Sequence, residues 1–319
     1  MQKNKKWKVL VSAPYFQPVV DIYAPFFEEY NIDIIVPEVR ERMSEEELLA
    51  CIMDIDGAIC GDDRFTDRVL ACAPKLKVLS KWGTGIDSID RESAARHGIS
   101  VRNTTNAFTD AVADLTMGFM LAFARQIPWS NEDIRNGIWH KRPGISLGES
   151  TLGIIGLGNI GRAVAKRASA FGMKIVGYDV MTLPPEVLIG TGIEVVFFDQ
   201  VLSESDFITL HCDLNPGNKY LISDAQFDLI RPNAVIVNTA RGPLIEEAAL
   251  VHALEEKKIA GAALDVFEQE PLPADSRLRE FSNVLFSPHN ANSSPSAWKR
   301  VHENTLKNLI EELCKQPGS

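Results

Sequence analysis

The sequence predicts an α/β protein built around parallel sheets. Short apolar runs alternate with amphipathic segments along the chain, which is the pattern of strand–helix–strand units in a parallel sheet. The 319 residues are enough for two domains of ordinary size. The composition, 45% hydrophobic and 24% charged, is that of a globular protein with a full-sized core.

The first sheet is predicted from short apolar runs, and helices are predicted between them. The strands are expected at residues 8–11, 32–36, 57–60, 77–79 and 99–101, and the helices at 44–53, 66–72 and 88–97. Ser44 and Glu47 have the spacing of a capping box. Residues 106–125 are apolar on every face, so we expect a helix buried by a second domain or a second subunit. The polar stretch 129–150 is expected to be an arm or linker.

A second α/β block begins at Thr151. Its strands are predicted at residues 151–155, 174–178, 194–197, 207–210, 234–238, 261–264 and 284–286, with helices between them. The segment 301–314 has one apolar face and is predicted to be a helix.

Charge and cysteine content exclude several classes of protein. The net charge of −10 argues against broad binding to nucleic acid. The apolar runs are too short for a transmembrane helix or a signal peptide. Five cysteines without a CxxC pair indicate reduced thiols and a cytoplasmic protein, and no metal site is expected.

The most informative motif is G-x-G-x-x-G at residues 156–161, which follows an apolar strand and opens a helix. Gly156 makes the tight turn, Gly158 lets a pyrophosphate approach the backbone, and Gly161 lets helix and strand pack closely. The helix N-terminus then offers N–H groups to the phosphates. Asp179 ends the next strand, 23 residues after Gly156. A carboxylate there binds ribose hydroxyls and repels a 2′-phosphate, which favours NAD over NADP.

Three polar residues, Arg241, Glu270 and His289, each come shortly after a predicted strand of the second block. The carboxyl edge of a parallel sheet is where α/β proteins bind ligands. An arginine at that edge can pair with a carboxylate, and a histidine can exchange protons. Each residue taken alone is more readily explained by a structural role, as a surface ion pair, a loop acid or a hydrogen-bonded histidine.

With these motifs the chain resembles the D-isomer-specific 2-hydroxyacid dehydrogenase family, in particular 3-phosphoglycerate dehydrogenase-like members without a regulatory domain. The matching segments are 83–87, 124–128, 151–161, 238–242, 261–267, 270–271 and 287–289. The resemblance implies an NAD-dependent enzyme that interconverts a 2-keto acid and a D-2-hydroxy acid by hydride transfer. It further implies that Arg241 binds the substrate carboxylate, and that His289, paired with Glu270, is the general acid and base.

The resemblance also implies binding residues. For the substrate they are Lys81, Trp82 and Gly83, beside Arg241. For NAD they are Thr84, Gly156, Gly158, Asn159, Ile160, Gly161, Asp179, Cys212, Thr239, Ala240, Asp265, Asn290 and Ala291.

The implied fold consists of two doubly wound domains, a Rossmann NAD-binding domain inserted in a smaller, flavodoxin-like substrate domain. Residues 1–103 and 290–319 are expected to form the substrate domain, and residues 104–289 the NAD-binding domain. Residues 104–150 match the family's dimerisation region, so we expect a homodimer. Besides its own second copy, the protein is expected to bind a small-molecule keto or hydroxy acid. It is expected to bind neither nucleic acid nor a membrane.

One departure from the family bears on the substrate. Phosphoglycerate dehydrogenases often carry a phosphate-binding arginine where Cys60 stands here, and the nearby Asp62 and Asp63 add negative charge. A phosphorylated substrate is therefore disfavoured, although Lys81 can stand for another basic position. Two alternatives stay open: an NAD(H)-sensing, corepressor-like binding protein on the same fold, and a phosphite dehydrogenase-like enzyme, whose lysine position aligns with Thr84.

Overall fold

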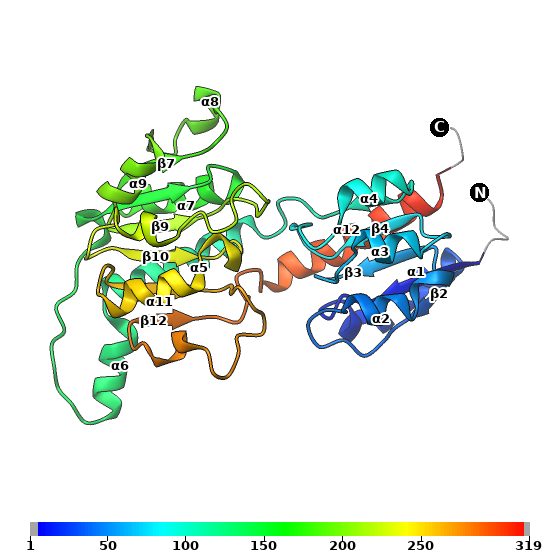
Figure 1. The fold of residues 1–319 in the computed structure, drawn as a ribbon, viewed down its shortest axis with the longest axis horizontal. Coiled ribbons are helices and arrows are strands. Elements are labelled where there is room, and N and C mark those ends of the chain that lie inside the picture. Colours follow the sequence, from blue (N-terminus) through cyan, green and yellow to red (C-terminus); the bar gives the residue numbers. More distant parts are fainter. Residues whose placement is uncertain (1–5, 316–319) are drawn as a thin grey trace. The chain divides into compact units, whose positions relative to one another are not determined.

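The structure is a computed structural model that describes residues 6–315. The chain divides into two compact units, which can be followed by colour in Figure 1. Unit 1 consists of Met1–Ala107 and Ser294–Ser319, and unit 2 of Phe108–Ser293. The boundaries predicted from the sequence, after residues 103 and 289, each lie four residues before those of the units.

The sheet of unit 1 is fully parallel, with the strand order β2-β1-β3-β4-β5. Its strands lie within two residues of the predicted runs at each end. They are β1 (Trp7–Val11), β2 (Ile32–Ile35), β3 (Gly57–Cys60), β4 (Val78–Lys81) and β5 (Ser100–Arg102). The order reverses between β1 and β3, and sheets of this kind bind ligands at the carboxyl ends of the two strands that flank the reversal.

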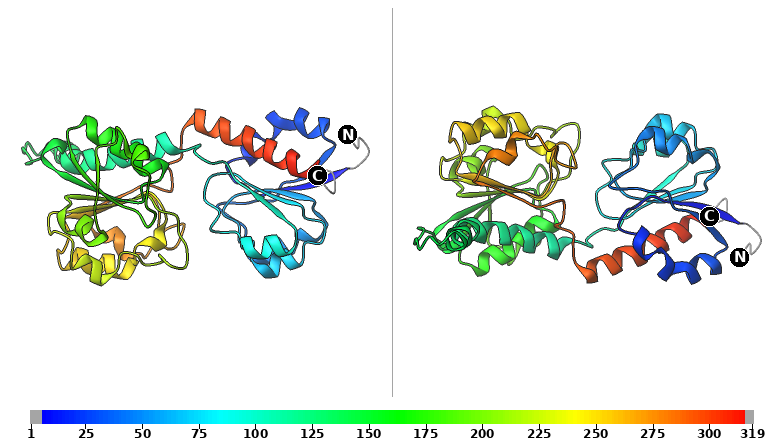
Figure 2. Two further views of the ribbon diagram at one scale, coloured as in Figure 1. Left: turned by 90° about the horizontal axis from the view of Figure 1, so that it is seen from above. Right: turned by 90° about the horizontal axis from the view of Figure 1, so that it is seen from below.

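Helices cover both faces of this sheet (Figure 2). On one face lie η1 (Gln17–Tyr23), α1 (Ala24–Glu29) and α12 (Pro295–Leu313). On the other lie α3 (Asp67–Ala71) and α4 (Arg91–Arg96), and their core also takes in α2 (Glu45–Leu49) and η2 (Ile52–Asp54). The capping box of Ser44 and Glu47 is confirmed, whereas the helical turns of residues 17–29 were not predicted.

Helix α12 begins six residues before its predicted start at residue 301. Pro295 occupies the first helical position, where its fixed φ suits the helix and its missing N–H costs nothing. The apolar spacing behind the prediction starts only at Val301, so the first turns were missed.

Strand alternation decides which side chains of unit 1 meet α12. Ser80 points to this helix and donates a hydrogen bond from Oγ to the Thr305 carbonyl oxygen at 2.7 Å. Leu79, one residue earlier, points to the opposite core. Gly57 of β3 lies under α12 so closely that a Cβ there would be 2.9 Å from Leu309 Cδ1. The Leu309 side chain of α12 thus packs directly against the backbone of β3 at Gly57.

The sheet of unit 2 is also parallel, with the order β12-β11-β10-β9-β6-β7-β8. Its strands are β6 (Thr151–Ile155), β7 (Lys174–Tyr178), β8 (Ile193–Val195), β9 (Phe207–Leu210), β10 (Val235–Asn238), β11 (Gly261–Leu264) and β12 (Val284–Phe286). The order reverses between β6 and β9. Two parallel sheets of this kind confirm the predicted α/β fold class.

Helices also cover both faces of the second sheet (Figure 2). On one face lie α5 (Thr109–Ala124) and α7 (Asn159–Ala170); on the other lie α9 (Phe198–Glu204), α10 (Asp224–Phe227) and α11 (Glu247–Glu255). The shorter elements are α8 (Pro185–Leu188), η3 (Leu147–Glu149), η4 (Gly242–Leu244) and η5 (Arg277–Glu280).

Two expectations for residues 106–150 need correction. Helix α5 packs against α7 and β10, so unit 2 itself covers much of the apolar surface that was assigned to another domain or subunit. The expected arm begins as a helix, α6 (Ile127–Arg135). Pro128 lies in its first turn, a position that favours helix initiation. The polar composition of the segment had concealed this helix.

We expect Gly57→Ala to lower the free energy of unfolding of unit 1 by about 1–3 kcal/mol, because the added methyl group overpacks the contact with α12. Urea unfolding followed by tryptophan fluorescence measures this. Leu309→Val shortens the opposing side chain, so the double variant should lose less than the sum of the two single losses. Strict additivity would contradict the contact.

Candidate active site

The fold places the predicted site residues at the carboxyl edges of the two sheets. In unit 2, Gly156, Gly158, Asn159, Ile160 and Gly161 follow β6, Asp179 follows β7, Cys212 follows β9, Thr239, Ala240 and Arg241 follow β10, Asp265 and Glu270 follow β11, and His289, Asn290 and Ala291 follow β12. In unit 1, Lys81 ends β4, and Trp82, Gly83 and Thr84 follow it.

The glycine-rich turn has the geometry of a phosphate cradle. Gly156 has a φ of 96°, and a Cβ there would be 2.6 Å from the carbonyl carbon of His211. A Cβ on Gly161 would be 2.1 Å from the Gly156 carbonyl oxygen, so α7 and β6 approach each other closely. Apart from its own chain neighbours, no described residue has an atom within 4 Å of the Cβ position of Gly158. The backbone there has room for a phosphate group at the N-terminus of α7, so the residues present fit a dinucleotide.

Asp179 is tied to this turn. Its carboxylate accepts hydrogen bonds from the N–H groups of Leu157 at 2.7 Å and Met181 at 2.9 Å, one on each oxygen. An ionised carboxylate has about four acceptor positions, so ribose hydroxyls can still bind to it. The acid thus both fixes the turn and presents the chemistry that recognises a ribose.

Asp265 joins three loops at the site. Its side chain is wholly buried and accepts hydrogen bonds from the N–H groups of Asn290 at 2.8 Å and Ala291 at 2.9 Å. Its own N–H donates to the Asn238 carbonyl oxygen at 3.0 Å, and its carbonyl oxygen accepts from the His289 N–H at 2.7 Å. The chain after β12 is thereby fixed to the ends of β10 and β11.

His289 and Glu270 form a hydrogen-bonded pair. His289 Nδ1 lies 2.8 Å from Glu270 Oε2, and Glu270 Oε1 accepts from the Phe267 N–H at 2.9 Å. Because an ionised carboxylate only accepts, Nδ1 carries the hydrogen, and Nε2 is the nitrogen that can exchange a proton with a substrate. His289 has a φ of 51°, a conformation that non-glycine residues adopt mainly where surrounding contacts hold them.

Arg241 lies in a tightly held loop. The Asn238 side chain closes the loop, since Nδ2 donates to the Arg241 carbonyl oxygen at 2.9 Å and Oδ1 accepts from the Ala240 N–H at 3.0 Å. A Cβ on Gly242 would be 1.9 Å from the Phe267 carbonyl carbon. This contact brings the arginine's loop against the segment whose backbone binds Glu270.

The end of β9 adds a thiol and an imidazole next to the glycine turn. Burial raises the pKa of Cys212 to about 11, so its thiol stays protonated at neutral pH. His211 has both ring nitrogens buried without a hydrogen-bond partner among residues 6–315. Its desolvation lowers its pKa to about 3. Both side chains are therefore neutral where the glycine turn begins.

In unit 1 the two neighbouring acids have different roles. Asp63 is buried and accepts hydrogen bonds from Ser12 Oγ at 2.6 Å and from the N–H groups of Met43 and Gly61 at 2.6 and 3.0 Å. It holds the loops together. Asp62 remains about half exposed and pairs with the buried Lys81, with 2.6 Å between Oδ1 and Nζ. The basic position at the end of β4 is thus already neutralised.

Sequence analysis missed the aromatic neighbours of Trp82. Tyr15 lies beyond the end of β1, and Trp298 lies in the first turns of α12. Both rings have centroids within 6 Å of that of Trp82, at 5.5 Å and 5.9 Å. The only signal was an aromatic pair, Tyr15 and Phe16, a few residues after the first predicted strand.

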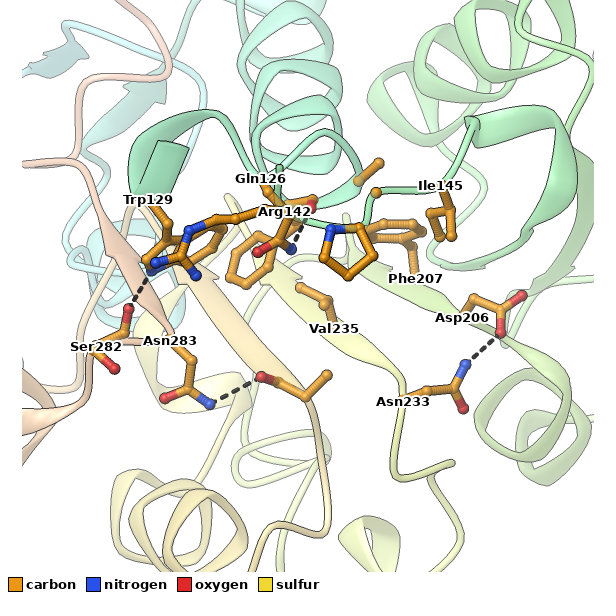
Figure 3. Close-up of a pocket in the computed structure, with 15 residues that line it drawn as sticks. Gln126, Trp129, Arg142, Ile145, Asp206, Phe207, Asn233, Val235, Ser282 and Asn283 are labelled. Atoms are coloured by element: carbon orange, nitrogen blue, oxygen red, sulfur yellow. Dashed lines mark hydrogen bonds between the residues drawn. The ribbon is translucent and has the colours of Figure 1, made fainter. Parts of the chain in front are cut away.

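A pocket of ≈ 370 Å³ lies at the opposite, amino-terminal edge of the unit 2 sheet (Figure 3). Trp129 of α6 closes one side and donates from Nε1 to the Ser282 carbonyl oxygen at 2.7 Å. Arg142 lies beside it and is held by two hydrogen bonds to Asp133, at 2.6 and 3.0 Å. This pocket contains none of the predicted site residues, and it is lined by the end of α5, Trp129 of α6, the segment after α6 and the residues at the strand starts.

Within residues 6–315, no three His, Cys, Asp or Glu side chains are grouped so as to hold a metal ion. In the same range, no helix has the length and apolarity needed to cross a bilayer.

Comparison with known proteins identifies relatives over most of the chain. Residues 117–291 match the model of the D-isomer specific 2-hydroxyacid dehydrogenase, NAD binding domain. A D-3-phosphoglycerate dehydrogenase of Methanocaldococcus jannaschii is 43% identical over 316 residues, which are 97% of this chain but 58% of that protein. A glyoxylate reductase of Thermofilum pendens is 40% identical over 88% of this chain and 85% of its own length.

Solved structures agree with these relatives. A glyoxylate reductase from Paecilomyes thermophila superposes with a TM-score of 0.84 at 29% identity, covering 97% of this chain and 96% of that one. A D-lactate dehydrogenase from Aquifex aeolicus, complexed with NAD and lactic acid, has a TM-score of 0.84 at 26% identity, with 94% and 93% covered.

The buried His211 predicts a pH-dependent stability. The unfolded chain protonates this residue near pH 6.5, whereas the folded chain does so only near pH 3. Between these values the unfolded state binds the extra proton, so the free energy of unfolding falls as the pH falls. We expect His211→Gln to reduce this slope by up to about 1.4 kcal/mol per pH unit, measured by urea unfolding between pH 6.5 and 5. Identical slopes in the two proteins would refute the assignment.

Proposed function

The chain belongs to the D-isomer-specific 2-hydroxyacid dehydrogenase family, and on that premise we propose that it interconverts a 2-keto acid and a D-2-hydroxy acid. Its cofactor is NAD, because residues 117–291 match the family's NAD-binding domain. The curated relatives include D-3-phosphoglycerate dehydrogenases and glyoxylate reductases, so the substrate is proposed here from the residues of this chain.

The observation that carries the proposal is the contact between His289 and Glu270. Nδ1 of the imidazole lies 2.8 Å from the carboxylate, and the carboxylate is itself fixed by a backbone N–H. This arrangement orients the ring and selects the tautomer in which Nε2 handles the proton. In the proposed reduction, His289 gives that proton to the keto oxygen as the carbon becomes a secondary alcohol, and in the oxidation it takes it back.

Arg241 is proposed to bind the substrate carboxylate. A guanidinium matches a carboxylate with two parallel hydrogen bonds, which orients the neighbouring carbon as well as binding the acid. The loop geometry supports this role, because Asn238 and Gly242 fix the backbone on both sides of the arginine. Bound NAD supplies or accepts the hydride at that carbon, which no side chain of the protein can do.

The NAD contacts proposed for unit 2 lie at the carboxyl edge of its sheet. The N-terminus of α7, with Asn159, Ile160 and Gly161, would hold the pyrophosphate, and Asp179 would hold the ribose hydroxyls. Further contacts are proposed for Thr84, Gly156, Gly158, Cys212, Thr239, Ala240, Asp265, Asn290 and Ala291. The open space at Gly158 and the remaining acceptor positions of Asp179 support this assignment.

Unit 1 is proposed to be the substrate domain, with unit 2 the NAD-binding domain. Lys81, Trp82 and Gly83 would then belong to the part that selects the substrate. Gly83 has a φ of 129°, and its carbonyl oxygen accepts from the Thr104 N–H at 2.9 Å, which fixes the turn after β4. The ion pair of Lys81 with Asp62 argues against a substrate whose distal group is a phosphate.

A homodimer is proposed through α6 and the segment that follows it. Exposed apolar side chains are concentrated there: Ile127, Ile134, Ile138, Trp139 and Ile145. Trp139 is 89% exposed, which is costly for so large an apolar side chain unless another surface covers it. The pocket of Figure 3 lies beside this segment and adds a concave surface to the same region.

The reaction is tested by NADH oxidation with a panel of 2-keto acids, including glyoxylate, hydroxypyruvate, pyruvate, 2-ketoglutarate and 3-phosphohydroxypyruvate, with NADPH alongside. We expect turnover with NADH, and we expect His289→Ala to lower kcat by about 10²–10⁴-fold because the proton donor is lost. His252→Ala is the matched control, since this exposed histidine pairs only with a surface acid, Asp224.

Fluorescence titration with NADH measures cofactor binding separately from turnover, so the possible outcomes can be told apart. Turnover that survives in His289→Ala would contradict the assigned acid and base. Tight NADH binding without turnover of any acid would contradict the enzyme proposal and favour an NAD(H)-sensing binding protein.

We expect Trp139→Asp to convert the dimer to a monomer, because a charge replaces the most exposed apolar side chain of the proposed interface. Sedimentation velocity at micromolar concentration measures the change. Phe197→Asp is the matched control, since this ring is 81% exposed on another part of unit 2 and should leave the dimer intact. A wild-type protein that sediments as a monomer would rule out the interface.

A further inference from the structure

We propose, on the basis of the function proposed above, that the substrate carries an apolar side chain, aromatic or branched, which packs on Tyr15. The surface that would receive it belongs entirely to unit 1. It consists of Tyr15, Trp82 and Trp298, called here the aromatic wall. At the end of the adjoining strand β4, Lys81 is already paired with Asp62 and so does not favour an anionic side chain.

The aromatic wall lies where a sheet of this order binds ligands. The order reverses between β1 and β3, so ligands are expected at their carboxyl ends. Tyr15 comes four residues after the end of β1. Its loop is fastened to β3, because the N–H groups of Ser12 and Ala13 both donate to the Ile59 carbonyl oxygen, at 2.9 and 3.2 Å. The ring is thus carried by a loop of defined position.

The three rings contact one another. The centroid of Tyr15 lies 5.5 Å from that of Trp82 and 5.5 Å from that of Trp298, and the two indoles are 5.9 Å apart. These are the separations of favourable tilted and edge-to-face pairs. Trp82 is 5% exposed, whereas Tyr15 is 38% exposed. The buried indole of Trp82 therefore supports the phenol ring of Tyr15, which presents accessible surface, and Trp298 is intermediate in exposure.

A buried histidine, His302, holds Trp82 of the aromatic wall in place through a hydrogen bond. Trp82 Nε1 donates to His302 Nδ1 at 2.9 Å, so this nitrogen must be unprotonated. Desolvation lowers the pKa of His302, which keeps the imidazole neutral and able to accept. Strand alternation explains the pairing, because Trp82 points to the same face as Ser80, toward α12. His302 is thus a positioning residue for the wall.

The charges at the end of β4 and in the loop after β3 do not favour a phosphate or a second carboxylate. Lys81 is 4% exposed in its side chain and already pairs with Asp62 at 2.6 Å. Arg64 of the same loop is exposed, but the Lys81–Asp62 pair presents its acid rather than its amine to solvent, because the carboxylate of Asp62 is about half exposed. An anionic side chain placed near it would be repelled, whereas an apolar one loses only its contact with water.

The test is a comparison of kcat/KM for phenylpyruvate, 3-phosphohydroxypyruvate and glyoxylate with the full chain and NADH. Glyoxylate has no side chain, so it reports the reaction without the wall. We expect phenylpyruvate to be the best of the three. In Tyr15→Ala the ratio of phenylpyruvate to glyoxylate should fall about tenfold, the size expected for the loss of one aromatic contact.

Matched variants separate this role from a structural one. Tyr15→Phe keeps the ring and should restore the wild-type ratio. Tyr30→Ala removes a tyrosine that precedes the amino end of β2, at the other edge of the same sheet, and should leave the ratio unchanged. A partial loss of folding would lower kcat/KM for all three substrates by the same factor and would not change the ratio. A changed ratio therefore reports the contact, and an unchanged ratio in Tyr15→Ala overturns the inference.

Two further outcomes distinguish this inference from the function on which it rests. Efficient turnover of 3-phosphohydroxypyruvate or glyoxylate with poor turnover of phenylpyruvate overturns the inferred role of the aromatic wall. The proposed dehydrogenase activity then still stands. Failure to turn over any keto acid overturns the proposed dehydrogenase, and the inference about its substrate falls with it.

Discussion

The hydrogen bonds of one buried carboxylate, Asp265, determine the geometry of the candidate site in unit 2. A carboxylate withdrawn from water is stable only when several donors surround it, and Asn290 and Ala291 supply two through their backbone N–H groups. The backbone of Asp265 also bonds to Asn238 and to His289. The ends of three strands are therefore held at fixed positions, and the left-handed conformation of His289 is kept by contacts outside its own loop.

The two units follow the same rule with different chemistry. Each has a parallel sheet whose strand order reverses once, and in each most of the polar or aromatic residues of interest lie at the carboxyl ends of the strands. In unit 2 these residues are glycines, acids and an imidazole, which suit phosphates and proton exchange. In unit 1 they are rings and a neutralised lysine, which suit an apolar group. The proposed division of labour between cofactor and substrate follows from this difference in side chains.

Local sequence predicted most strands because they are short apolar runs, and β3, β6, β7, β9, β11 and β12 have the predicted bounds. It also located the glycine turn and the His289 region. It did not distinguish Asp62 from Asp63, because adjacent acids of the same type differ here only in whether backbone donors surround them. Nor did it bring Tyr15 to Trp298, since the return of α12 to unit 1 depends on tertiary contacts that no local periodicity contains.

The discontinuity of unit 1 has a consequence for biosynthesis. Helix α12 covers the face of the first sheet that carries Gly57 and Ser80, and it follows the whole of unit 2 in the chain. On the ribosome, the inserted unit is complete before this helix has emerged. The part of this apolar face that α12 covers must therefore wait uncovered in the nascent chain, where it is a natural binding surface for chaperones.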